Sequence, residues 1–282
     1  MPELPEVETV RRGLKDFILN AKIKQVKVLC EKSFIGKPVC GTICDIRRFG
    51  KALAIDLDND WSLMVHLRMT GQLIFDGAER YAAGHPNENF VAKLPNKQTR
   101  VILEFENGTL YFNDQRKFGF IKVLPTAEVE KDTFIRKLAK EPWKMTSEEL
   151  YQKLQRRKNS AIKSVILDQA VISGLGNIYA DEALYQARIH PARKAGSLSK
   201  EEAMTLLEAA SRVMDKSIEL GGSTMRNYVK ADGTRGNYLD LFAKVYQRDG
   251  EPCERCGTKI VKIKVGGRGT HFCPKCQKEE HD

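Results

Sequence analysis

The sequence of 282 residues lacks every segment that would carry it into or across a membrane. It has no run of about 18 apolar residues, the length that a helix needs to cross a bilayer, and no basic amphipathic stretch typical of a surface anchor. The first residues include acids where a signal peptide has basic residues, and no apolar core follows them. Internal repeats and low-complexity tracts are also missing. We therefore expect a cytoplasmic protein that does not bind membranes.

Negative charge is in the minority. There are 37 Asp and Glu residues against 47 Lys and Arg residues, which gives a formal net charge of +10. Basic proteins are attracted to phosphate backbones by a term that does not depend on base sequence. The remaining composition, 41% hydrophobic and 30% charged, is typical of a globular protein, and the length suffices for two ordinary domains. Nucleic acid is the expected partner.

The chain has seven cysteines, and four of them form two CxxC pairs near the C-terminus. The scattered cysteines are Cys30, Cys40 and Cys44, and the paired ones are Cys253, Cys256, Cys273 and Cys276. Each pair can place two thiolates on one tetrahedral ion, and the intervening Lys-rich stretch with Gly266-Gly267 suits a β-hairpin that joins the pairs. One zinc ion is expected, with a structural role because four sulfurs close the site. The alternatives are two disulfides or a redox pair.

The first half of the chain reads as one helix followed by strands. Apolar residues repeat at helical spacing from Pro5 to about Leu19. Short β-rich runs then predict strands at 24–29, 42–47, 52–57, 62–67, 101–106, 109–113 and 119–124. Asn107-Gly108 predicts a type I′ hairpin turn, and the stretch from Asp76 to Gln98 reads as a long surface loop. Seven or eight such strands favour a β-sandwich.

The second half reads as helical. A charged stretch from Pro125 to Met145 with two prolines is typical of an interdomain connection. Capping boxes at Thr146/Glu149 and Ser199/Glu202, and a cap at Ser160, predict the starts of three helices, and a fourth begins near Ile178. The segment from Ser223 to Glu251 has no clear period, so it is either disordered or functional.

The first six residues combine an amine with two acids. Removal of Met1 would leave Pro2 with a terminal secondary amine, and such a group has a pKa of about 7.7–8.0 and reacts with electrophilic sugar carbons. Glu3 and Glu6 lie about one helical turn apart and could carry protons for it. The simpler interpretation is that Pro5 and two acids make a good helix N-terminus.

Several other positions suit phosphates or bases. The glycine-flanked helix start at Asn177 exposes backbone N–H groups to an anion, although many capped helix starts look the same. Arg268 on the finger hairpin presents a guanidinium, or is part of a solvated basic turn. The segments that contain Lys51, Arg116 and Phe118 pair cations with an aromatic, as do nucleic-acid-binding surfaces that stack on bases and hold phosphates. Residues that also suit a core are Phe118, Met69 and His66.

Five motifs, in this order, resemble those of bacterial formamidopyrimidine-DNA glycosylase. They are Pro2 to Val10, His66 to Gly71, Asp114 to Gly119, Gly174 to Glu182, and the four-cysteine finger. The resemblance covers nearly the whole chain. It implies an α+β multidomain protein, in which an N-terminal β-sandwich with a leading α-helix precedes a helix-two-turn-helix domain with a C-terminal zinc-finger β-hairpin. The implied bounds are 1–130 for the catalytic sandwich, 131–146 for a linker, 147–240 for the helical domain with a lesion-closing loop at about 223–240, and 241–282 for the finger.

The resemblance also implies an activity. Such an enzyme is a monomeric glycosylase and AP lyase of base excision repair in the bacterial cytoplasm, associated with the nucleoid when on DNA. It removes oxidised purines, notably 8-oxoguanine and formamidopyrimidines, from damaged double-stranded DNA, and then cleaves the strand by β,δ-elimination. Pro2 then resembles the nucleophile that forms a Schiff base, Glu3 the residue that protonates the opening sugar ring, and Glu6 a structural acid that helps to hold both.

The remaining implied roles concern DNA. Met69, Arg116 and Phe118 resemble the trio that fills the space left by the extruded nucleotide, which is an insertion that kinks duplex DNA. The implied phosphate ligands around the lesion are Lys51, which belongs with the catalytic residues, Asn177 and Arg268. The segment 223–240 corresponds to the loop that closes over the base, with Thr224 and Arg226 in it.

Two other readings remain open. The sister endonuclease VIII type prefers oxidised pyrimidines, but its start typically reads Pro-Glu-Gly-Pro-Glu and its wedge residues are contiguous, so Leu4 and the separated wedge residues favour the purine type. A non-catalytic zinc-finger DNA-binding protein would have no need of Pro2 beside two acids. The sequence departs from the family in its long 76–98 loop and in Gln98-Thr99-Arg100, which replaces a histidine-rich stretch.

Overall fold

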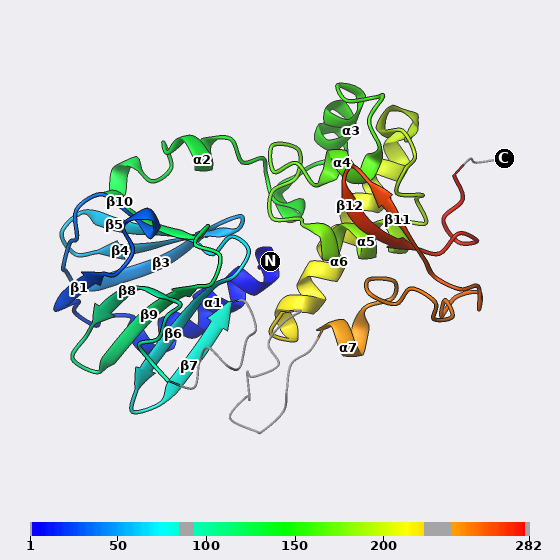
Figure 1. Ribbon diagram of the computed structural model, residues 1–282. Coiled ribbons are helices and arrows are strands. Elements are labelled where there is room, and N and C mark those ends of the chain that lie inside the picture. Colours follow the sequence, from blue (N-terminus) through cyan, green and yellow to red (C-terminus); the bar gives the residue numbers. More distant parts are fainter. Residues whose placement is uncertain (1, 85–92, 223–237, 280–282) are drawn as a thin grey trace. The chain divides into compact units, whose positions relative to one another are not determined.

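The computed structural model describes residues 2–84, 93–222 and 238–279 (Figure 1). The chain forms two compact units, which we call unit 1 (Met1–Arg136 with Ile218–Asn237) and unit 2 (Lys137–Ser217 with Tyr238–Asp282). The predicted closing-loop residues Thr224 and Arg226, with most of that loop, lie outside the described residues. No described helix is both long and apolar enough to cross a membrane.

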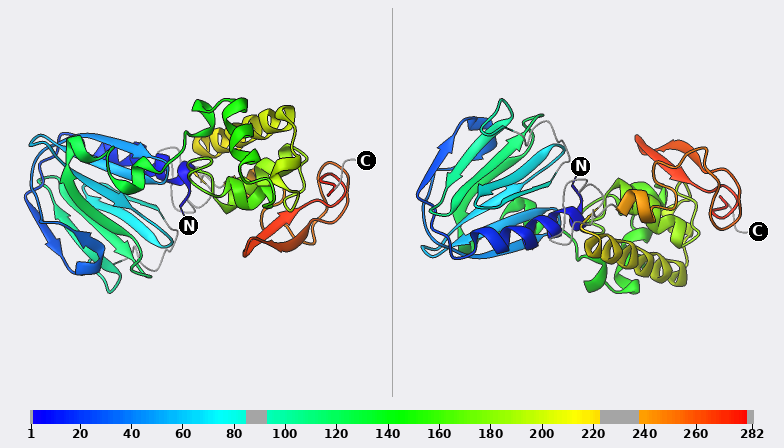
Figure 2. Two further views of the ribbon diagram at one scale, coloured as in Figure 1. Left: turned by 90° about the horizontal axis from the view of Figure 1, so that it is seen from above. Right: turned by 90° about the horizontal axis from the view of Figure 1, so that it is seen from below.

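Unit 1 is a sandwich of two five-stranded sheets, which form two layers in the views of Figure 2. One sheet has the order β1-β8-β9-β6-β7 and the other β2-β10-β5-β4-β3. Neighbouring strands are antiparallel, except for β2 and β10, which are parallel. The strands are β1 Gln25–Val28, β2 Phe34–Ile35, β3 Ile43–Phe49, β4 Ala52–Leu57, β5 Trp61–His66, β6 Gly71–Gly77, β7 Arg80–Gly84, β8 Thr99–Glu104, β9 Gly108–Asp114 and β10 Phe120–Pro125.

The sandwich confirms the predicted β-fold and corrects two details. The predicted loop from Asp76 to Gln98 is wrong at its start, because strand β7 lies inside it and pairs with β6. Strand β6 was not predicted from the sequence either. Strand β7 was missed because its Ala-Ala-Gly end lacks β-branched residues. The hairpin between β8 and β9 is present, but its turn is not type I′. Of Asn107 and Gly108, only Gly108 has a positive φ, and its 155° is outside the left-handed helical region.

Helix α1 (Leu4–Ile18) closes one side of the sandwich. Its buried apolar stripe, with Val7, Val10 and Leu14, packs against β3 and β7, which are edge strands of the two sheets. Tyr81 of β7 lies directly on Gly13, where an added Cβ would come within 2.2 Å of the ring. A short apolar cluster on the second sheet is covered by the segment that contains the 3₁₀ turn Thr126–Glu128 and α2 (Thr133–Arg136).

Unit 2 is built from short helices and one hairpin. The helices are α3 Ser147–Gln155, α4 Ile162–Ile166, α5 Asn177–Gln186, α6 Lys200–Glu219 and α7 Tyr238–Phe242. The last residues of α6 belong to unit 1. Unit 2 also has 3₁₀ turns at Pro142–Lys144 and Ala195–Ser197, and unit 1 has one at Glu31–Ser33. Strands β11 (Val261–Val265) and β12 (Arg268–Phe272) form the predicted hairpin.

The predicted helix caps of unit 2 are confirmed at two of three positions. Both hydrogen bonds of the capping box are present at Thr146 and at Ser199. The cap at Ser160 is wrong. Helix α4 starts after Ala161 without a side-chain cap, and the Ser160 N–H instead donates to the carbonyl of Arg157.

Candidate active site, nucleic-acid interface and metal centre

The start of helix α1 buries Pro2 beside two acids. Glu3 and Glu6 are each only 2% exposed, and Pro2 is buried as well. The backbone N–H of Glu3 donates to Glu6 Oε2 at 2.8 Å, and the Glu3 carboxylate accepts the backbone N–H of Glu6 in return. This capping box fixes both carboxylates next to residue 2. The same contacts therefore agree with both interpretations of this segment, as a well-capped helix start and as a pair of acids beside an amine.

A glycine from the other end of unit 1 lies against this acid pair. Gly222 follows the end of α6, and a Cβ added there would lie 3.3 Å from both Cγ and Oε1 of Glu6. Its φ of +90° also favours glycine. Gly221 has a similar φ of +81°, but an added Cβ there would meet nothing within 4 Å. Residue 222 is therefore constrained by Glu6 as well as by its own backbone.

The acid that ties α1 to Lys51 is Glu8, which the sequence reading missed. Its carboxylate accepts hydrogen bonds from Arg11, Arg12 and Arg48 at 2.7–3.0 Å. Burial alone would raise the pKa of Glu8, but the three guanidinium groups outweigh it and lower that pKa to about 2. Arg48 also donates to the carbonyl of Gly50, so the turn that carries the buried Lys51 is fastened to helix α1. The available signal was the spacing of Arg11 and Arg12 from Glu8.

His66 lies in strand β5 near Lys51 and is a core residue. It is 6% exposed, and its ring contacts those of Phe120 and Phe134. Burial lowers the pKa of His66 to about 3, with help from the nearby charges of Arg68 and Lys51. Its Nδ1 accepts the backbone N–H of Arg68 at 3.0 Å. A histidine that stays neutral and already accepts a hydrogen bond is suited to structure and not to proton transfer near neutral pH.

The predicted wedge residues meet at one end of unit 1. Met69 precedes β6, whereas Arg116 and Phe118 follow β9, and the two strands are paired in one sheet. Phe118 is 54% exposed, and the Arg116 guanidinium lies over its ring, 4.8 Å from the centroid. Met69 is half-buried. Phe118 is therefore not a core residue, and an exposed aromatic held by a cation is a surface suited to bases.

Unit 2 brings the other two phosphate candidates together. Asn177 opens α5, and its Nδ2 donates to the carbonyl of Gly269, the residue after Arg268, at 3.0 Å. The hairpin can approach so closely because Gly266 has no side chain. A Cβ there would lie 2.2 Å from Ser164 Oγ. Asn177 and Arg268 thus share one surface, although they are far apart in the sequence.

A buried ion pair supports that surface, and sequence reasoning missed it. Lys163 and Asp181 are fully buried, with Nζ 2.6 Å from Oδ1. The same Nζ donates to Thr270 Oγ1 at 2.8 Å, and Asp181 Oδ2 accepts the backbone N–H of His271 at 2.9 Å. Helices α4 and α5 therefore hold β12 through one polar network. Nothing in the sequence marks this lysine, because a lone Lys in a helical pattern usually reads as solvated.

The four paired cysteines converge at the base of the hairpin. Their sulfurs all lie within 4.8 Å of one another, and two of the separations are 3.9 Å (Cys253 to Cys276) and 3.5 Å (Cys256 to Cys273). A tetrahedral zinc ion with Zn–S bonds of about 2.3 Å separates its sulfurs by about 3.8 Å. The donor set and its spacing fit that ion. The Tyr185 hydroxyl, 3.3 Å from Cys253 Sγ, adds an outer contact.

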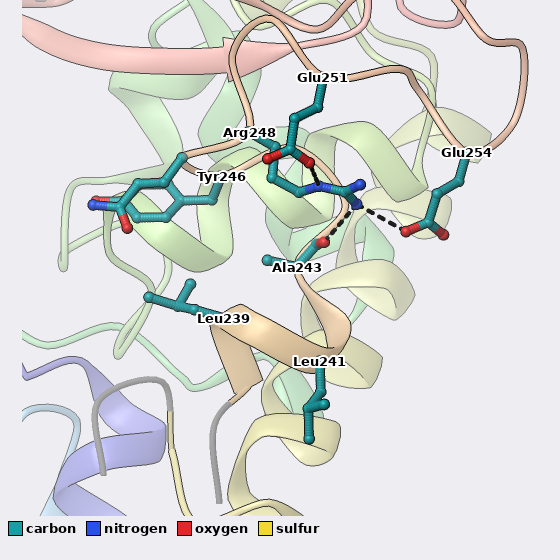
Figure 3. Close-up of a pocket in the computed structure, with 8 residues that line it drawn as sticks. Leu239, Leu241, Ala243, Tyr246, Arg248, Glu251 and Glu254 are labelled. Atoms are coloured by element: carbon teal, nitrogen blue, oxygen red, sulfur yellow. Dashed lines mark hydrogen bonds and ion pairs between the residues drawn. The ribbon is translucent and has the colours of Figure 1, made fainter. Parts of the chain in front are cut away.

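A pocket of about 370 Å³ in unit 2 is separate from these groups (Figure 3). It lies beside α7, and Figure 3 shows Arg248 between Glu251 and Glu254. The guanidinium is bonded to both carboxylates, at 2.7 and 2.8 Å, and to the carbonyl of Ala243. Because the cation is neutralised, the pocket does not favour an anion, and none of the described predicted site residues lines it.

Family models match three stretches of the chain. Residues 1–121 match the formamidopyrimidine-DNA glycosylase N-terminal domain, residues 138–229 the helix-two-turn-helix domain of the same enzyme, and residues 250–278 a zinc finger found in these glycosylases and in isoleucyl-tRNA synthetase. The finger and the cysteine geometry agree, so the four cysteines hold one structural zinc ion.

Relatives and solved structures cover the chain almost completely. It is 42% identical to the formamidopyrimidine-DNA glycosylase of Ligilactobacillus salivarius, over 98% of this chain and 99% of that one, and 43% identical to that of Pelotomaculum thermopropionicum, over 99% of each. The Lactococcus lactis enzyme in a complex with DNA containing an abasic site superposes with a TM-score of 0.85, at 34% identity over 98% of this chain and all of that one. The Thermus thermophilus enzyme gives 0.84, at 35% identity over 99% and 100%. The chain thus belongs to the formamidopyrimidine-DNA glycosylase family of base excision repair enzymes, in which AP lyase activity is typical.

Proposed function

We propose that this chain, once Met1 is removed, excises oxidised purines from duplex DNA through the secondary amine of Pro2. The observation that carries the proposal is that residue 2 is buried at the same helix start as Glu3 and Glu6, which hold each other in a reciprocal capping box. A capped helix start alone does not need two carboxylates that are 98% buried, because acids at a helix N-terminus are usually solvated. In the proposed site the Pro2 amine lies beside both carboxylates, which hold it and carry protons for it.

The proposed reaction begins with attack of the Pro2 nitrogen on C1′ of the damaged nucleotide. As the N–C1′ bond forms, the glycosidic bond breaks and the base leaves. Breakage of the C1′–O4′ bond then gives an iminium ion, with Glu3 delivering a proton to O4′ and Glu6 holding Glu3 and the amine in place. Loss of a C2′ proton expels the 3′-phosphate, and a second elimination expels the 5′-phosphate, which leaves a one-nucleoside gap.

The other predicted residues supply the DNA frame for this chemistry. Met69, Arg116 and Phe118 fill the space of the extruded nucleotide, because the base must leave the stack before the amine can reach its sugar. Lys51, Asn177 and Arg268 bind phosphates around the lesion. The exposure of Phe118 and the shared surface of Asn177 and Arg268 support these roles. Arg226 is proposed to act in the closing loop.

Borohydride trapping tests the nucleophile. Reduction in the presence of a duplex with 8-oxoguanine opposite cytosine is expected to join the protein covalently to the DNA, at Pro2 by peptide mass spectrometry. Pro2→Gly is expected to lose most of the cross-link, because a primary amine in a more mobile backbone replaces the fixed secondary one. A retained Met1 should abolish trapping while DNA binding persists. An undiminished cross-link in Pro2→Gly would exclude this role.

Glu3→Gln tests the proton donor separately from the nucleophile. The variant keeps a side chain that can accept the N–H of Glu6, so the helix start should remain folded. We expect base excision to fall by about 10²–10⁴-fold, the usual contribution of a positioned general acid, with DNA affinity nearly unchanged. Excision at the wild-type rate would remove Glu3 from the mechanism.

The choice of lesion is tested by comparing 8-oxoguanine with thymine glycol in the same duplex context. The separated wedge residues favour the purine, and a preference for thymine glycol would support the endonuclease VIII-like alternative. DNA binding without excision of either base would support the non-catalytic alternative.

We further propose that the protein acts as a monomer in the bacterial cytoplasm, on the nucleoid, without binding membranes, because its substrate is chromosomal DNA. The proposed parts are a catalytic sandwich (1–130), a linker (131–146), a helical domain (147–240) and a finger (241–282). Sedimentation of the zinc-loaded protein would test the monomer, and limited proteolysis would test the linker.

A further inference from the structure

Two turns lie side by side at one end of unit 1. Strand β6 begins at Gly71, just after the turn that carries Met69, and β9 ends at Asp114, just before the turn that carries Arg116 and Phe118. Gly71 and Asp114 are direct partners across the sheet. The three proposed wedge side chains therefore come from two chain segments whose spacing is set where these strands end.

A single buried carboxylate joins the two turns. Asp114 is fully buried. Its Oδ1 accepts the Thr70 hydroxyl and the backbone N–H of Arg116 (3.1 Å), and its Oδ2 accepts the backbone N–H of Gly119 at 2.7 Å. The Thr70 hydroxyl oxygen also accepts the Arg116 N–H, at 3.1 Å. One donor comes from the first turn and two from the second, so the carboxylate and the hydroxyl form a latch across both.

Neither turn is in a conformation that its own residues favour. Arg68, beside Met69, has a φ of 51°, and Lys117, between Arg116 and Phe118, has a φ of 57°. Side chains with a Cβ are disfavoured in this left-handed region, and such residues persist only where the surroundings fix them. The Asp114–Thr70 latch is the contact that reaches both turns. The Asp114 carboxylate can approach residue 119 closely because this residue is a glycine. A Cβ there would lie 3.2 Å from Asp114 Oδ2.

We propose that Thr70 and Asp114 are positioning residues that fix the distance between Met69 and the Arg116–Phe118 pair before DNA is bound. This inference rests on the proposed function, since it takes these three side chains as the wedge. On loose turns, exposed side chains would lose more conformational freedom on entering the base stack, and insertion would be less favourable. The latch removes that loss in advance. It acts on opening of the duplex and not on the chemistry at Pro2.

Thr70→Val tests the latch, because valine keeps the shape of threonine and removes its hydroxyl. A duplex with 2-aminopurine beside 8-oxoguanine reports unstacking by its fluorescence. We expect the variant to lower the unstacking amplitude and to slow single-turnover excision about tenfold, as expected for loss of one hydrogen bond to a charged group. Thr70→Ser, which restores the hydroxyl, should recover both. Trapping on a single-stranded abasic oligonucleotide needs no unstacking and should stay at the wild-type rate.

Ser62→Ala is the matched control. Its hydroxyl donates to the buried carboxylate of Asp56 at 2.6 Å in the other sheet, so its removal costs a similar hydrogen bond away from the turns. It should lower thermal stability as Thr70→Val does, yet unstack and excise normally. Asp114→Asn, which places an N–H₂ group against backbone donors, should slow excision from duplex DNA more than Thr70→Val does. If it fails to fold, the Thr70 series still decides.

The outcomes distinguish the positioning role of Thr70 and Asp114 from the proposed function of Pro2. If the wild-type protein does not cross-link to the abasic oligonucleotide, the proposed function of Pro2 fails. If the wild-type protein does cross-link but Thr70→Val unstacks and excises normally, or loses trapping on single-stranded DNA in proportion to its loss on duplex DNA, the positioning role is overturned.

Discussion

Units 1 and 2 hold their proposed DNA-binding groups by different means. In unit 1 the groups sit at the edges of a sandwich with a large apolar core, and single polar contacts such as the Asp114–Thr70 latch fix their turns. In unit 2 the helices are mostly short and the two-stranded hairpin cannot be stable alone. A metal site and the buried pair of Lys163 and Asp181 hold it instead.

Two further buried acids, one in each unit, have different partners. Glu182, which is fully buried, accepts the backbone N–H groups of Lys244, Val245 and Tyr246 at 2.9–3.0 Å. Burial raises the pKa of Glu182, and those N–H groups oppose the rise. In unit 1 the buried Glu8 lies among three arginines and its pKa falls to about 2. In unit 2 the three N–H groups thus tie the segment after α7 to helix α5, whereas in unit 1 the arginines tie helix α1 to strand β3.

Removal of zinc should reveal the largest difference between the two units. Structural zinc contributes about 10–16 kcal/mol of binding free energy in small fingers, so a strong chelator, or Cys253→Ser, is expected to release β11 and β12 and to abolish DNA binding. Hydrogen exchange should show lost protection in the hairpin and unchanged protection in the strands of unit 1. Cys44→Ser, at an exposed cysteine of unit 1, is the control. A hairpin that stays protected without metal would contradict the zinc-dependent fold of unit 2.

Lys163→Met should have the next largest effect. It leaves Asp181 buried without its cation, and breaking a buried pair typically costs about 3–5 kcal/mol. Urea unfolding of the full chain is expected to show this loss in unit 2. Lys200→Met, which removes a 60% exposed partner of Glu148, should change stability by at most about 1 kcal/mol. If the two variants were equally stable, the ion pair would not support the hairpin.

Glu8→Gln is expected to change how the stability of unit 1 depends on pH. The pKa of Glu8 is about 2 in the folded protein, well below its ordinary value of 4.5, so its contribution to stability is fully present above pH 4.5 and is lost as the pH falls toward 2. The shift corresponds to about 3 kcal/mol. Urea unfolding at pH 7 and pH 3 should show that the variant is less stable at pH 7 and loses less stability on acidification. Glu201→Gln, at an exposed acid of unit 2, is the control and should keep the wild-type pH dependence.

The smallest expected effect comes from Gly222→Ala. Both Gly222→Ala and Gly221→Ala place a Cβ at positive φ and should lower stability by about 1 kcal/mol. Only Gly222→Ala brings the Cβ against Glu6, so only it should also slow borohydride trapping, by a few-fold. Equal trapping by the two variants would mean that the contact with Glu6 has no bearing on the amine.

The sequence alone determined the local features of both units. Helix α1, the two capping boxes, most strands of the sandwich and the four-cysteine finger follow from periodicity and spacing within short stretches, and local physics acts on such stretches. Strand β7 was missed because its Ala-Ala-Gly end has no strand preference. It forms because Tyr81 packs on Gly13 and pairs with β6.

Only the tertiary structure decided which distant residues support the candidate site. Glu8 meets Arg48 across 40 residues, and Thr70 meets Asp114 across 44. Lys163 gives no sequence signal, since a lysine is buried only when the fold supplies a carboxylate such as Asp181. Pairing of this kind depends on which strands and helices become neighbours. The sequence therefore determined which residues are candidates for the chemistry, and the packing of each unit decided which residues hold them in place.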